Sequence, residues 1–264
     1  MTVPLAVTEY GDGAPGLSPV AILHGLFGSG RNWASIAQVL GANRRVLALD
    51  LRNHGASPWA ATMSYGEMAE DVRALMHARG FRRYALIGHS MGGKAAMIAA
   101  LRYGQEIERL IVIDIAPVAY RPHHLALVQA MRGLDLVGIT RRSEADARLR
   151  AAVPDPGERG FLLQNLVFED GRARWRINLD VIERSMAELV GFPAFPEGTV
   201  YQRPALFMAG ARSDYIRREH EPAIRRLFPK AEIARIPQAG HWLHSEQPQA
   251  FLARVEPFLD RAAK

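Results

Sequence analysis

The sequence contains no cysteine among its 264 residues. This absence excludes disulfide bonds, thiolate nucleophiles and metal sites with cysteine ligands. The zinc-binding motif H-E-x-x-H is also missing, so we expect no metal site. A chain without disulfides is compatible with a reducing compartment, and we expect a cytoplasmic protein.

Long apolar runs are absent as well. No apolar stretch approaches the ~18 residues that a membrane span needs, so we expect no membrane span. The first residues, MTVPLAVTEYGDG, lack both a basic start and a long apolar stretch. We therefore expect no secretion signal.

Charge of one sign does not accumulate in runs, although the net charge is +6. The arginines lie between acidic residues from Arg31 to Arg261, and doublets such as Arg141-Arg142 do not extend to five like charges. One interpretation of a net positive charge is binding to nucleic acid or to another acidic partner. The scattered pattern favours a solvated surface instead, and we expect no nucleic-acid partner.

Short apolar runs that alternate with helical patterns are present throughout most of the chain. Apolar runs of this length indicate strands buried on both faces, as in a parallel sheet. A capping box, Ser64 to Glu67, opens one helix, and 90–103 is a second helix candidate. This alternation predicts a doubly wound α/β fold. The predicted strands are Val20–His24, Val46–Asp50, Tyr84–Gly88, Leu110–Asp114, Ala205–Ala209 and Glu232–Ile236.

The alternation stops between residues 117 and 196. This stretch has no clear strand, and its helical patches lie at 124–132, 143–152 and 179–190. Ordinary crossover helices are one interpretation. The stretch is longer than one crossover needs, so we predict a helical cap at 117–196 on a core of 1–116 and 197–264.

The motif Gly88-His-Ser-Met-Gly92 places a serine between an apolar strand and a helix. The pattern G-x-S-x-G in this context is a nucleophile elbow, a sharp turn that exposes the serine oxygen. Small neighbours are needed because the backbone there is crowded. We predict that Ser90 is a nucleophile, against the alternative of a structural turn serine.

A serine nucleophile needs a base. His241 follows the last predicted strand, behind a flexible Ala-Gly pair, and we predict that it is this base. His244, three residues later, is expected to be a loop contact. A histidine that comes last matches the order Ser, acid, His along the chain.

An oxyanion needs two fixed backbone N–H groups. The elbow supplies the amide of Met91, and the glycine-containing loop after Val20–His24 supplies the amide of Leu26. His24 is either a second base or a residue that braces this loop, and we favour bracing.

The segments HGLFGSGRNW, DLRNHGAS, LIGHSMGGK, LIVIDIAP and AGHWLHSEQP together resemble the α/β-hydrolase superfamily. They are similar in particular to small capped serine esterases of the YbfF type, from about residue 3 to 260. The resemblance implies an eight-stranded, mostly parallel sheet with a helical cap inserted after strand six. It also implies hydrolysis of small-molecule acyl esters or thioesters without a cofactor, by a monomer or a homodimer.

Two carboxylates compete for the role of the acid that orients the base. Asp114 ends one predicted strand, and Asp214 follows the strand that is its neighbour in the implied sheet. Asp214 has the commoner superfamily position, but it comes one residue later than G-x-x-D requires. A charge that ends an apolar strand is costly unless it is paired, so we favour Asp114 and keep Asp214 open.

Aromatic residues near these motifs are candidate walls of a substrate pocket, and an apolar pocket would favour short to medium acyl chains. We expect Lys94 on the elbow helix to expose its amine. Arg121, His123 and His124 have two possible roles: they recognise a charged leaving group, or they form part of the solvated surface. Carbon–carbon bond hydrolases and small-molecule receptors share the same triad and remain alternatives. The candidate wall residues are Phe27, Trp33, Phe161, Trp175 and Trp242.

Overall fold

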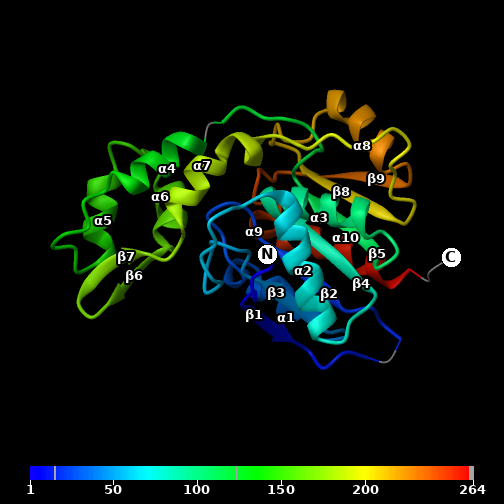
Figure 1. The fold of residues 1–264 in the computed structure, drawn as a ribbon. Coiled ribbons are helices and arrows are strands. Elements are labelled where there is room, and N and C mark those ends of the chain that lie inside the picture. The colour runs from blue at the N-terminus through cyan, green and yellow to red at the C-terminus, as the bar shows by residue number, and fades with distance from the viewer. Residues whose placement is uncertain (15, 123, 262–264) are drawn as a thin grey trace.

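The computed structural model describes residues 1–14, 16–122 and 124–261. Within these residues the main sheet has seven strands in the order β1-β3-β2-β4-β5-β8-β9. Only β1 runs antiparallel to its neighbour. The strands are β1 (Val7–Tyr10), β2 (Val20–Leu23), β3 (Val46–Leu49), β4 (Tyr84–His89), β5 (Ile107–Ile113), β8 (Ala205–Gly210) and β9 (Ala231–Ile236) (Figure 1).

All six strands predicted from the apolar runs are confirmed as β2, β3, β4, β5, β8 and β9. The expectation of eight strands is wrong by one. Among the described residues a single strand, β1, lies before the turn in which Gly11 and Gly13 have positive φ. β1 itself escaped prediction because its sequence, VTEY, is too short and too polar to form an apolar run.

Helices cover both faces of the sheet. The helices α2 (Tyr65–Ala78), α3 (Met91–Arg102) and α8 (Glu221–Leu227) share one hydrophobic core with the sheet, and α1 (Ala34–Leu40) and α10 (Pro248–Asp260) share the other. Alternate residues of β4 serve the two cores. Leu86 faces α2 and α3, whereas Ile87 faces α1 and α10. The predicted capping box is confirmed, because Ser64 and Glu67 exchange side-chain and backbone hydrogen bonds.

The segment 117–196, called here the inserted segment, leaves the core after β5 and returns before β8. It therefore follows the fifth strand of the main sheet, not the sixth, because the sheet has one strand fewer than expected. In Figure 1 it forms the lobe at the left. Its elements are α4 (His124–Arg132), α5 (Arg142–Leu149), α6 (Pro156–Leu163), β6 (Leu166–Glu169), β7 (Arg172–Trp175) and α7 (Leu179–Val190).

The antiparallel pair β6 and β7 corrects the expectation that the inserted segment has no strand. The turn between them places Asp170 and Gly171 at φ 50° and 71°. An Asp-Gly pair at these angles is typical of a tight hairpin turn. The dipeptide was visible in the sequence, but each strand has only four residues.

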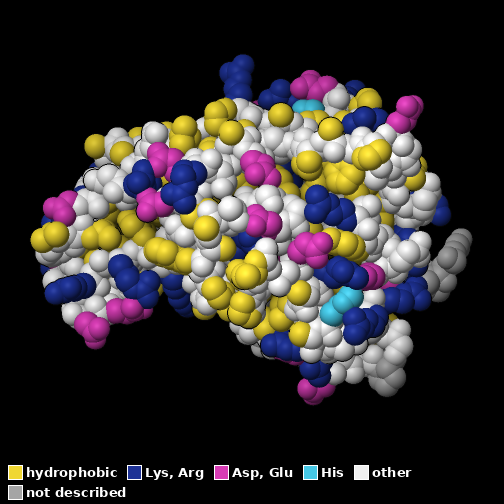
Figure 2. Space-filling view, in the orientation of Figure 1, with side chains coloured by type: hydrophobic (Ala, Val, Ile, Leu, Met, Phe, Trp, Pro, Cys, Tyr) yellow, Lys and Arg dark blue, Asp and Glu magenta, His cyan; other side chains and the backbone are white. Residues whose placement is uncertain are grey.

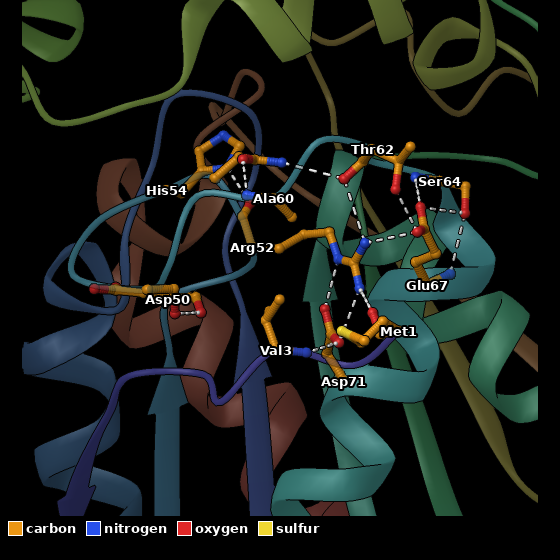
Figure 3. Close-up of polar contacts among 12 residues, drawn as sticks. Met1, Val3, Asp50, Arg52, His54, Ala60, Thr62, Ser64, Glu67 and Asp71 are labelled. Atoms are coloured by element: carbon orange, nitrogen blue, oxygen red, sulfur yellow. Dashed lines mark hydrogen bonds and ion pairs between the residues drawn. The ribbon is translucent and has the colours of Figure 1, made fainter.

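A buried ion network holds the loop that follows β3. The Arg52 guanidinium is 1% exposed and lies 2.6 Å from Asp71 and 2.9 Å from Glu67 (Figure 3). The next residue, Asn53, is in the left-handed region at φ 65°. Its backbone O accepts a bond of 3.0 Å from the Asn178 amide, and its side chain bonds that of Asn178 at 3.0 Å. Because Asn178 is the N-cap of α7, the core holds the start of that helix.

The surface carries charges of both signs. Figure 2 shows Lys and Arg side chains interspersed with Asp and Glu over one face of the molecule. Among the described residues, no helix is long and apolar enough to cross a membrane.

Candidate active site

Ser90 stands between β4 and α3 with φ 51° and ψ −116°. A residue other than glycine in this region stores roughly 1–3 kcal/mol of strain. The turn is possible because its glycines have no side chain. A Cβ on Gly88 would lie 2.3 Å from the Gly92 carbonyl O, and one on Gly92 would lie 2.5 Å from the His24 carbonyl O.

Asp114 and His241 are hydrogen-bonded. Asp114 directly follows β5 at φ 50° and is fully buried, and His241 lies in the loop after β9. His241 Nδ1 is 2.7 Å from Asp114 Oδ2. The Gly210 amide donates to Asp114 Oδ1 at 3.1 Å, and the Ser213 hydroxyl donates to Oδ2. The carboxylate thus has partners on both oxygens.

Burial dominates the ionisation of Asp114. It raises the pKa of the carboxyl to about 7, against the hydrogen bonds from Ser213 and Gly210, which lower it. A carboxyl in this state takes up a proton near neutral pH. Its ionised form depends on those two donors and on a cationic partner, the charge that His241 would carry as an imidazolium.

The structure does not bring Asp214 to His241. The Asp214 side chain is 87% exposed and lies 3.4 Å from Arg217. Its neighbour Ser213 turns inward to Asp114 instead. The loop after Gly210 has one residue more than the pattern G-x-x-D. As a result the Ser213 hydroxyl points into the site, and the Asp214 carboxylate points to solvent.

The loop that carries Leu26 is braced by His24. The Leu51 amide donates to His24 Nε2 at 3.0 Å, so Nε2 holds no proton and Nδ1 donates to the Gly25 carbonyl O at 2.8 Å. Burial lowers the pKa of His24, which keeps the ring neutral. These contacts agree with bracing and leave neither ring nitrogen available as a base.

Three hollows lie at the boundary between the core and the inserted segment, and Ser90 lines two of them. The Lys94 pocket, about 40 Å³, includes Leu26, Tyr65, Ser90, Met91, Lys94 and Leu189 in its lining. The His241 pocket, also about 40 Å³, includes Phe27, Ser90, Phe161, His241 and Trp242. The Trp33 cavity, about 270 Å³, includes Trp33, His89, Phe161, Trp242 and His244. Ser90 thus lies between two small pockets, and the larger cavity continues from the His241 side.

Of the predicted wall residues, the structure brings Phe27, Phe161 and Trp242 to the pocket of Ser90 and His241. Trp33 lines the adjoining Trp33 cavity instead, and Trp175 lines none of the three hollows. Trp33 is 1% exposed and stacks on His244 at 3.9 Å between ring centroids. Trp175 ends β7 and donates its indole N–H to the Met131 carbonyl O at 2.9 Å, within the inserted segment.

Comparison with known proteins agrees with this geometry. The family model described as "alpha/beta hydrolase fold" matches residues 18–248. The chain belongs to the α/β-hydrolase family. The mouse protein named sn-1-specific diacylglycerol lipase ABHD11 is 42% identical over 94% of this chain and 83% of its own length. Esterase YbfF of Escherichia coli K12 is 34% identical over 92% of this chain and 93% of its own.

A solved structure is similar over nearly the whole hydrolase. A marine microorganism esterase superposes with a TM-score of 0.93 at 36% identity, covering 97% of this chain and 100% of its own. The sequence resemblance to the esterase branch of the family is therefore confirmed.

Lys94 corrects an expectation from the sequence. Its side chain is 1% exposed, and burial lowers the pKa of its amine to about 7. Nζ donates to the carbonyl O of Val190 at 2.8 Å and of Gly191 at 2.5 Å. The amine that we expected in solvent thus lies at the C-terminal end of α7.

Tyrosines near the hydrolase site were also missed by sequence analysis. Tyr215 stacks on His241 at 4.1 Å, and Tyr120 donates its hydroxyl to the Tyr215 carbonyl O at 2.6 Å. No motif marked them, because both lie in loops. Arg121 and His124 line the Lys94 pocket, whereas His123 lies outside the described residues.

Proposed function

We propose that this protein is a serine hydrolase that cleaves carboxylic esters through an acyl-enzyme on Ser90. The observation that carries the proposal is the 2.7 Å bond between His241 Nδ1 and Asp114 Oδ2, at a pocket that His241 shares with Ser90. The similarity to proteins named esterase and lipase supports the same reaction class.

The first half of the reaction forms the acyl-enzyme. Because Asp114 engages Nδ1 of His241, Nε2 is the nitrogen that takes the proton from Ser90 as its oxygen attacks the acyl carbonyl. Asp114 stabilises the imidazolium that results. His241 then returns the proton to the leaving alcohol, which departs.

The second half releases the acid. His241 takes a proton from the water that attacks the acyl carbonyl. It then returns that proton to the Ser90 oxygen as the bond from Ser90 to the acyl group breaks and the acid leaves. The backbone N–H groups of Leu26 and Met91 bind the oxyanion in both halves. Leu26 lies in the loop braced by His24, and Met91 is the first residue of α3.

The pockets suggest where each part of the ester binds. His241 gives its proton to the leaving group, so the His241 pocket and the Trp33 cavity beyond it take the alcohol side. The acyl chain then occupies the Lys94 pocket, whose lining includes Leu26, Met91 and Leu189. A volume of about 40 Å³ favours short acyl chains.

Thioesters are included in the proposal as substrates of the same mechanism. The division into a core of 1–116 and 197–264 and a cap of 117–196 stays a prediction. The monomeric or homodimeric state and the cytoplasmic location also stay predictions, as does the independence from cofactors.

The test is hydrolysis of p-nitrophenyl esters from acetyl to decanoyl by wild type and Ser90→Ala. We expect wild-type turnover of about 1 s⁻¹ or more. Ser90→Ala should lower kcat/KM by roughly 10⁴-fold or more. Wild-type turnover that survives in Ser90→Ala would overturn the mechanism.

A further inference from the structure

Lys94 and Ser90 are one helical turn apart. The Lys94 amide donates to the Ser90 carbonyl O at 3.1 Å, and residues four apart lie on the same side of a helix. Both side chains line the Lys94 pocket. The position of the lysine is thus set by the same turn that places the nucleophile.

The amine of Lys94 binds the end of a helix from the inserted segment. Its acceptors are the carbonyls of Val190 and Gly191 at the C-terminus of α7, with that of Leu189 at 3.5 Å. The last carbonyls of a helix have no partner within the helix and carry partial negative charge. Tyr65 of α2 donates to the Leu189 carbonyl O at 2.5 Å and adds a second link from the core.

A buried lysine with no carboxylate partner among the described residues costs free energy that an apolar side chain would not. Its described contacts are those carbonyls and the faces of Tyr120 and Tyr65, at 4.9 and 5.8 Å from Nζ to the ring centroids. Burying a charge costs free energy unless partners offset it, and a methionine would fill the same volume without that cost. The lysine therefore supplies something that packing alone does not.

What it supplies is a fixed distance between two walls of the Lys94 pocket. One wall is α3, with Ser90 and Met91, and the other is the end of α7, with Met186 and Leu189. The bonds from Nζ hold the second wall against the first. A pocket of about 40 Å³ is the result.

We propose that Lys94 determines acyl-chain selectivity, because its amine holds the C-terminal end of α7 against the elbow helix and so limits the depth of the acyl pocket. This inference rests on the proposed esterase function. Lys94 is a positioning residue, since it acts on the substrate through α7.

The test compares kcat/KM for p-nitrophenyl butyrate and octanoate in Lys94→Met. Methionine keeps the unbranched stem and removes the N–H donors, so α7 is released and the octanoate-to-butyrate ratio should rise about tenfold. One methylene more or fewer in a hydrophobic pocket typically changes discrimination by roughly 10- to 200-fold. Lys230→Met is the matched control, because Lys230 is exposed, and its ratio should equal that of wild type.

Lys94→Arg gives an independent arm if Lys94→Met does not fold. Arginine keeps the charge and the donors on a longer side chain, so the ratio should stay low or fall. A wild-type ratio in Lys94→Met, with both substrates slowed equally, would overturn the proposal, as would a raised ratio in Lys94→Arg. Failure of the esterase function is separate, since it would appear as turnover that does not depend on Ser90.

Discussion

Asp114 Oδ2 lies 2.7 Å from His241 Nδ1, although 127 residues separate the two along the chain. The parallel sheet makes this contact possible. Asp114 follows β5 and His241 follows β9, and these strands end at the same edge with β8 between them. The chemistry of the site therefore depends on sheet order as much as on the motifs.

The two aspartates should differ sharply when each is replaced. Asp114→Asn should lower kcat/KM by about 10⁴-fold, because an amide holds the wrong histidine tautomer. Asp214→Asn is the matched control and should stay within about twofold, because its side chain points to solvent and Arg217. Steady-state kinetics on p-nitrophenyl butyrate measures both. Equal losses, or a larger loss in Asp214→Asn, would contradict the assignment.

The pH dependence of activity should follow the buried carboxyl. Burial raises the pKa of Asp114 to about 7, and its neutral form does not stabilise the imidazolium. We therefore expect kcat/KM to fall as pH drops below about 7, with an apparent pKa that belongs to the Asp114–His241 pair. A wild-type profile that is flat down to pH 5 would contradict this.

Protonation of Asp114 should have the opposite effect on stability: it should lower activity at acidic pH but raise the free energy of unfolding there. A carboxyl whose pKa is raised by folding stabilises the folded state fully below its unfolded value, near 4, and this contribution is lost as pH rises through about 7. The free energy of unfolding of wild type relative to Asp114→Asn should thus decrease from pH 4 to pH 8. Urea unfolding at several pH values measures it, and an increase would be the contrary result.

Much of the site could be predicted from sequence because it rests on local patterns. The elbow needs glycines beside Ser90, and the six main strands are short apolar runs between turns. Local sequence patterns could not decide between Asp114 and Asp214 as the acid, because the two residues follow neighbouring strands of the sheet, β5 and β8. It depends on the loop after Gly210, where Ser213 turns inward and Asp214 outward.

The environments of Lys94 and Trp175 could not be predicted from the sequence, for a different physical reason. The burial of Lys94 depends on carbonyls at the end of α7, almost 100 residues away, and lysine is rarely buried. Trp175 packs within the inserted segment and not at the site, because its indole N–H donates to the Met131 carbonyl O. In each case the partner is set by tertiary contacts rather than by a motif.

The N-cap of α7 should contribute more to stability than an ordinary N-cap. Asn178→Ala removes a hydrogen bond to the Val181 amide and the side-chain bond to Asn53. Asp155→Ala is the control, because within the described residues the Asp155 side chain accepts one hydrogen bond, from the Glu158 amide, and so caps α6. We expect a loss of about 2 kcal/mol for Asn178→Ala and about 1 kcal/mol for Asp155→Ala. Urea unfolding tests this, and a smaller loss at Asn178 would refute it.

Removing the buried Arg52 should destabilise the core strongly. Arg52→Met leaves the Asp71 carboxylate buried without its cation, which typically costs roughly 3–5 kcal/mol. The double variant Arg52→Met/Asp71→Leu removes both charges and should recover most of that loss. Free energies of unfolding for the single and double variants decide the point. Additive losses would mean that the ion pair is not the source of the effect.

The central claim is that Ser90 becomes covalently modified, and a fluorophosphonate tests it most directly. Such a reagent reacts with an activated serine oxygen and stays attached. The account predicts one added group per chain, on the peptide that contains Ser90, and no label in Ser90→Ala when both are analysed by mass spectrometry. Labelling of another residue, or an active enzyme that takes no label, would contradict it.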